Sequence, residues 1–177
     1  MCENEINKVL DFWFGSKTSK DYLKMRSFWY GSKTDDDFVR KHLSDSYSLA
    51  RNGLLDHWME AGEGEGALAL IILLDQVPRN IFRDTPQAYA TDPKALSIAK
   101  YIVEKGWDKQ MNGVFRRYVY SPFNHSENLE DQKKSLQLFS ELGDSSHMYW
   151  VQSHYDLIRQ YGRFPHRDHI LGRHSNT

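Results

Sequence analysis

The amino-acid sequence predicts an all-α protein of a single domain, and three observations support this. Apolar residues recur at i, i+3, i+4 and i+7 along much of the chain, which is the spacing of helices that bury one face. Runs of alternating apolar and polar residues on both sides of a hairpin turn, the sign of paired strands, do not occur. The chain has 177 residues, a length typical of one domain, so we assign residues 1–177 to one helical domain.

The first half of the chain contains the segment expected at the centre of the fold. A first helix is predicted around residues 6–13, and a second runs from Thr34 to Gly53 with an acidic start that suits the helix dipole. A short helical turn over 54–59 comes next. The run from Ala67 to Leu74 then contains no polar side chain. Because a helix that is apolar on every side is usually buried, we expect 67–74 to be the most buried element.

Helices in the second half are predicted from capping residues and apolar stripes. Asp92 and Pro93 are typical of an N-cap followed by proline at the first helical position. Asn112 can cap a helix that should end near Pro122, because proline lacks a backbone N–H. Two further helices are expected over residues 129–143 and 145–162. The total is about seven helices of ordinary length.

Composition excludes several classes of function. With 23 basic and 24 acidic residues, the chain has no global positive field to attract nucleic acid. The longest apolar run is far shorter than the roughly 20 residues that cross a membrane, so no membrane span is expected. The single Cys2 cannot form an internal disulfide, and the N-terminal sequence does not resemble a secretory leader. A cytoplasmic protein is therefore expected.

Three polar segments, 75–83, 124–127 and 163–173, follow or interrupt the apolar ones. If they converge, basic side chains outnumber the acids Asp75, Glu127 and Asp168 and leave net positive charge. Several arginines around one hollow favour carboxylate or phosphate. The candidate ligand-binding residues are Arg79, Arg83, His125, Arg163, His166, Arg167 and Arg173. The alternative is that these groups pair with one another, Asp75 with Arg79 for instance, and only hold loops over helix ends.

An enzyme is the rival interpretation of the same residues. His125 or His166 would carry a proton, and Glu127 or Asp75 would orient that histidine. The chain has eight histidines, but none has the spacing of a zinc site, so no metal or other cofactor is expected.

Two long motifs carry a family resemblance. Leu73–Arg83 and Gly162–Arg173, together with His125–Glu127, resemble the bacterial domain of unknown function 924 family, and the likeness extends from Val9 nearly to the last residue. The resemblance implies a tetratricopeptide-like helical array, although no repeat is visible in the sequence. It implies no particular activity. Members tend to continue into a further acidic segment, so part of a last helix is expected to be missing after Thr177.

Two positions depart from the family pattern. Asn124 stands where relatives usually have methionine. Asp168 stands where they usually have asparagine, which adds a negative charge next to Arg167.

The leading interpretation is a cytoplasmic helical protein with one pocket, rich in arginine and histidine, for a small anion or an acidic peptide end. A hydrolase-type enzyme that uses a histidine–carboxylate pair in the same pocket is the first alternative. A structural protein with no small ligand is the second. Nothing in the sequence predicts the oligomeric state.

Overall fold

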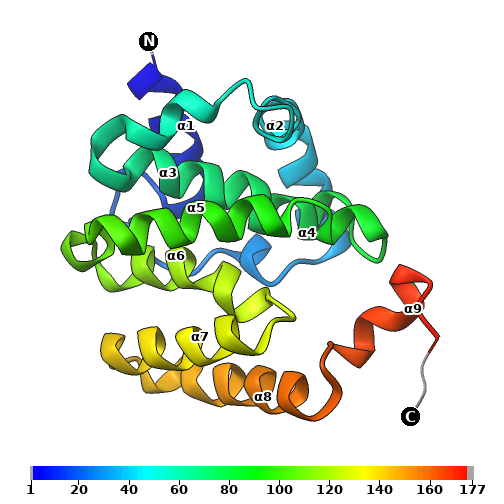
Figure 1. Cartoon of the computed structure of the whole chain (residues 1–177). Helices are drawn as coiled ribbons and strands as arrows, with labels where there is room; N and C mark the ends of the chain where they lie inside the picture. The colour runs from blue at the N-terminus through cyan, green and yellow to red at the C-terminus, as the bar shows by residue number, and fades with distance from the viewer. Residues whose placement is uncertain (1, 175–177) are drawn as a thin grey trace.

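The computed structural model describes residues 2–174 and, over that range, contains helices and turns but no strand (Figure 1). The α-helices are α1 (Cys2–Phe14), α2 (Lys33–Arg51), α3 (Glu65–Ile71), α4 (Val77–Ile81), α5 (Asp92–Lys105), α6 (Gly113–His125), α7 (Leu129–Leu142), α8 (Ser145–Tyr161) and α9 (Asp168–Leu171). They form one compact domain, so the predicted all-α class is confirmed. The continuation expected after Thr177 lies outside the described residues.

Helix α3 is the centre of the fold, as its apolar sequence predicts. Every residue from Ala67 to Leu74 is fully buried, and α3 packs against α1, α5 and α6. Figure 1 shows α3 enclosed between α1 and α5. None of the described helices is both long and apolar enough to span a membrane.

The central helix continues through Pro78 by way of one π-helical turn, Ile72–Gln76. Pro78 lies in the first turn of α4, inside this continuous helix, and has no backbone N–H to donate. Without that N–H, the carbonyl of Leu74 is left available, and the Thr91 hydroxyl donates to it at 2.6 Å. Asp75, Gln76 and Arg79 therefore follow the apolar run on one continuous helix.

Two predicted helix boundaries were wrong in ways that matter for the site. Helix α6 passes through Pro122 and ends at His125, because the proline removes one hydrogen bond while the flanking turns stay helical. His125 thus lies on α6, one turn beyond Ser121. At the start of α5, Thr91 rather than Asp92 occupies the N-cap position, and the Asp92 carboxylate binds Arg79 instead of capping the helix.

The second half of the chain is a stack in which α5, α6, α7 and α8 each pack on the next (Figure 1). After α8, a turn at Pro165–Arg167 and helix α9 bring the chain back to the connection between α6 and α7. This return places the third polar segment beside the second.

Candidate functional site

Asp75 and His125 form a buried carboxylate–imidazole pair. His125 Nδ1 lies 2.8 Å from Asp75 Oδ1, and the amide of Gln76 donates to Asp75 Oδ2 at 2.8 Å. Asp75 is 0% exposed. Burial alone would raise the pKa of Asp75, but the charges of His125 and Arg79 and these hydrogen bonds outweigh it and lower the pKa to about 2. The carboxylate is therefore ionised and holds His125 in one orientation.

Arg79 binds the carboxylate of Asp92 and the backbone carbonyl of Asp75. Its two terminal nitrogens bind Asp92 at 2.7 and 3.0 Å, and Nη1 also donates to the Asp75 carbonyl at 2.6 Å. The distance from Nη1 to Asp75 Oδ1 is 3.7 Å. Burial opposes the charge of Arg79, but Asp75 and Asp92 outweigh it and raise the pKa of the guanidinium. Arg79 is consequently held beside the site by structural ion pairs with these carboxylates.

Arg83 is paired in the same bidentate way. Its Nε and Nη2 donate to the two oxygens of Asp36 at 2.6 and 2.8 Å, and Asn80 donates to the same carboxylate at 2.9 Å. Burial would raise the pKa of Asp36, but the bonds from Arg83 and Asn80 outweigh it and lower the pKa. Asp36 therefore does more than complement the dipole of α2, since it links that helix to α4.

Arg167 is the basic residue of the site that is not paired in this way. It is only 6% exposed, and its guanidinium lies 4.4 Å from the ring centre of Tyr89 and 4.6 Å from that of Phe164. Nη2 donates to the His125 carbonyl at 3.1 Å, while Nη1 is 3.9 Å from Asp92. The buried Nε has no hydrogen-bond partner among the described residues. Burial, and next the charge of Arg79, lower the pKa of Arg167.

These groups border a cavity of about 350 Å³, which we call the cationic cavity. It contains five of the seven basic residues named from the sequence, and they come from all three polar segments. Its charged and imidazole-bearing lining residues are Arg79, Arg83, Asp84, His125, His154, His166 and Arg167. The geometry thus brings part of the three motifs to one place.

Neutral imidazoles line the part of the cationic cavity near α8. Burial lowers the pKa of His154 to about 4, and its Nδ1 bonds to the Asn124 carbonyl at 3.0 Å. Burial, and next the charge of Arg167, lower the pKa of His166. At neutral pH these two histidines act as polar, uncharged groups.

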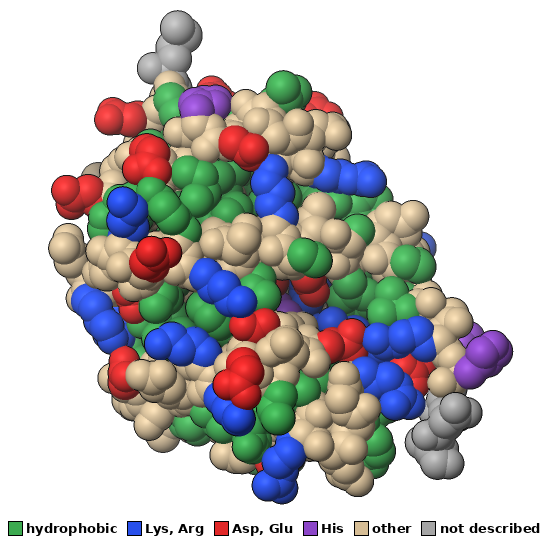
Figure 2. Space-filling view, viewed as in Figure 1, with side chains coloured by type: hydrophobic (Ala, Val, Ile, Leu, Met, Phe, Trp, Pro, Cys, Tyr) green, Lys and Arg blue, Asp and Glu red, His purple; other side chains and the backbone are tan. Residues whose placement is uncertain are grey.

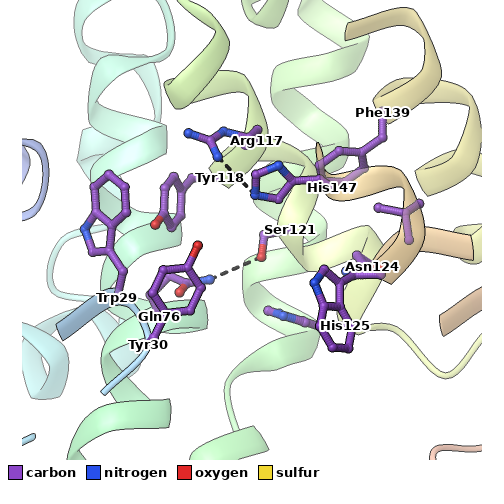
Figure 3. A pocket seen from close by; sticks show the side chains of 12 residues that line it. Trp29, Tyr30, Gln76, Arg117, Tyr118, Ser121, Asn124, His125, Phe139 and His147 are labelled. Atoms are coloured by element: carbon purple, nitrogen blue, oxygen red, sulfur yellow. Dashed lines mark hydrogen bonds between the residues drawn. The ribbon is translucent and has the colours of Figure 1, made fainter. Parts of the chain in front are cut away.

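A second cavity of about 230 Å³ adjoins the first; we call it the aromatic cavity. Five aromatic side chains line it, together with polar ones that include Arg117, which is bonded to His147 at 3.0 Å. The two cavities share Trp29, Tyr30, Gln76 and His125. Figure 3 shows Trp29 and Tyr30 facing His125 across this space, with the Gln76 amide bonded to Ser121 at 3.2 Å between them.

Arg163 and Arg173 do not line the cationic cavity. They form what we call the C-terminal ion cluster with Glu127 and Asp168. Arg163 binds both oxygens of Asp168, and Arg173 binds Asp168 at 3.0 Å and Glu127 at 2.8 Å. The bond from Arg163 is the main reason that the pKa of Asp168 is lowered. Figure 2 shows acidic and basic side chains side by side on the surface near the C-terminus.

Glu127 is held by this cluster and by the backbone N–H of Phe164, which donates at 2.6 Å. Of the two carboxylates considered as partners of a catalytic histidine, Asp75 is therefore the one that binds His125. Within residues 2–174, no group of three or more His, Cys, Asp or Glu side chains is arranged to hold a metal ion.

Several residues of the site were not predicted from the sequence. Asp92 and Asp36 lie 13 and 47 residues from the arginines they bind, and as acids near helix starts they are explained without any partner. The sequence around Trp29 and Tyr89 indicates only aromatic side chains packed between helices. Ser121 could have been predicted, because it precedes His125 by four residues, which places both on one face of a helix.

Comparisons with known proteins identify the family and leave the activity open. No curated protein matches the chain. Among solved structures, the protein of unknown function ATU0120 from Agrobacterium tumefaciens is similar, with 31% identity and a TM-score of 0.87 over 99% of this chain and 94% of that one. The model of a family described as bacterial protein of unknown function (DUF924) matches residues 9–177. The chain therefore belongs to the DUF924 family of bacterial proteins.

Proposed function

We propose that the protein binds a small anion in the cationic cavity, against Arg167 and beside His125 and His166. The observation that carries the proposal is the state of Arg167. Its guanidinium is removed from water, its buried Nε has no partner among the described residues, and the nearest carboxylate oxygen is 3.9 Å away. A buried charge that is incompletely paired is costly, and an anionic ligand would offset that cost.

The other arginines of the cavity support this assignment by contrast. Asp92 binds Arg79 and Asp36 binds Arg83, so the charge of each is already offset by a carboxylate at hydrogen-bond distance, whereas the charge of Arg167 is not. A carboxylate or a phosphate group would suit the planar fork of Arg167. The carboxylate of an acidic peptide end has the same chemistry.

Thermal unfolding in the presence of acetate or inorganic phosphate tests the proposal. A ligand that binds only the folded state stabilises it by about 2.7 kcal/mol at 100 times its Kd, which raises the Tm of a domain of this size by roughly 5 to 10 °C. Arg167→Gln should lose the shift. Arg51→Gln is the matched control, because Arg51 is exposed at the end of α2 and lines neither cavity, so this variant should keep the shift. Equal shifts in all three proteins would indicate a general salt effect and favour a structural role without a ligand.

The Asp75–His125 pair supports a second candidate, a hydrolase-type enzyme. A carboxylate that binds Nδ1 of an imidazole at 2.8 Å orients its Nε2 for proton transfer, and His125 lines both cavities. Chromogenic esters and phosphoesters are suitable probes. Turnover that is lost in His125→Asn, and kept in His57→Asn on the exposed surface, would support catalysis; equal rates in both variants would count against it.

A further inference from the structure

We infer that the ligand is an aryl carboxylate, with its carboxylate at Arg167 in the cationic cavity and its ring in the aromatic cavity. The inference rests on the proposed anion binding and extends it to the body of the ligand. Its basis is the joined shape of the two cavities and the different character of their walls.

The cavities meet at fixed groups. Both are lined by Gln76 and His125, and each of these side chains is held by Asp75. Gln76 also donates to Ser121, so its amide nitrogen has two hydrogen-bond acceptors that fix its position. Trp29 is anchored because its Nε1 donates to the Trp13 carbonyl at 3.0 Å. A ligand that spans the boundary would meet a preorganised wall, which limits the entropy lost on binding.

The aromatic cavity has apolar surface that the protein itself leaves in water. Trp150 is 61% exposed and Tyr30 is 71% exposed, although both line this cavity. Large exposed aromatic side chains that surround a hollow are typical of a binding site for an apolar group. A ring placed between them would remove part of both side chains from water.

The charges around the site favour a ligand with one negative charge over a dianion. Arg79 and Arg83 are paired with Asp92 and Asp36, Asp75 is ionised beside His125, and Asp84 adds a further acid to the lining. Among the lining arginines of the described chain, Arg167 is thus the one with no carboxylate within hydrogen-bond distance, since Asp92 is 3.9 Å away. A monocarboxylate fits this balance better than a phosphate dianion does. Cavity volumes of about 350 and 230 Å³ suit a carboxylate on a single ring system.

Calorimetric titration with phenylacetate, acetate and phenylacetamide tests the inference. Phenylacetate has both a ring and a negative charge, acetate has the charge alone, and phenylacetamide has the ring alone. Phenylacetate should bind about tenfold or more tightly than acetate, because its ring is buried, and more tightly than phenylacetamide, because it is charged. In Trp150→Ala the preference for phenylacetate over acetate should fall to about threefold or less while acetate binds as in the wild type.

Tyr161→Ala is the matched control. Tyr161 is also an exposed aromatic residue of α8, 39% exposed, but it does not line the aromatic cavity, so this variant should keep the full preference. Equal binding of acetate and phenylacetate by the wild type would overturn the inference and leave the proposed anion binding intact. An unchanged preference in Trp150→Ala would also overturn it. Phenylacetamide binding as tightly as phenylacetate, or no binding of either acid, would overturn the proposed function as well.

Discussion

Asp75→Asn is the substitution that most directly tests how the site is held together. Asparagine has nearly the same shape, so the change removes the charge and leaves the volume. His125 Nδ1 then loses its carboxylate partner at 2.8 Å. Arg79 loses the negative charge of a carboxylate oxygen 3.7 Å away. Because these charges are buried, the loss should appear as a lower free energy of unfolding.

The expected size follows from the pKa of Asp75. It is about 2 in the folded protein, against 3.8 for the group in its ordinary state. Each unit corresponds to about 1.4 kcal/mol, so the ionised carboxylate contributes on the order of 2 kcal/mol. Since the folded-state pKa is the lower of the two, this stabilisation is fully present above the ordinary pKa and is lost as the pH falls through the folded value.

Urea unfolding at pH 7 and at pH 3 provides the measurement. The difference between the wild type and Asp75→Asn should be on the order of 2 kcal/mol at pH 7 and about half of that at pH 3. Asp84→Asn is the matched control, because Asp84 lines the same cavity without a hydrogen bond or ion pair to the other described residues. A difference that is absent at pH 7, or equal at both pH values, would refute the reasoning.

Two further predictions concern the core and metal content. Leu74→Ala should cost roughly 2 to 5 kcal/mol in chemical unfolding, because the side chain is fully buried in the central helix; a loss below about half a kcal/mol would contradict this packing. A chelator should leave the Tm unchanged and elemental analysis should find no stoichiometric metal, since the described residues offer no ligand set; one metal per chain that disappears in His125→Asn would reverse this.

The fold could be predicted because its main signals are local. The eight apolar residues 67–74 identify the buried helix without knowledge of any partner, and they are fully buried. Capping was nearly as informative: Asn112 accepts from the backbone N–H of Phe115 at 2.9 Å, as expected for an N-cap. The end of α6 could not be predicted, since whether a helix tolerates Pro122 depends on the packing around it.

The site could be predicted only in part, because charge pairing is a tertiary property. The sequence identified the basic residues of the three segments but not their partners. Arg163 and Arg167 are four residues apart, yet one binds Asp168 in the C-terminal ion cluster and the other lies between Tyr89 and Phe164. Asp168, which appeared to oppose an anion site beside Arg167, instead binds Arg163 and Arg173.

The ion pairs of the C-terminal ion cluster explain how Arg167, which has no such pair, is kept in place. Without other contacts, the buried guanidinium of Arg167 would favour a conformation in which its segment of the chain turns toward water. That segment is held by the C-terminal ion cluster, in which Glu127 of the α6–α7 connection binds both Arg173 and the Phe164 backbone. Phe164 in turn packs on Arg167. The paired residues of the third motif therefore position Arg167 against the His125 carbonyl, and the energy of those pairs maintains a site that would otherwise relax.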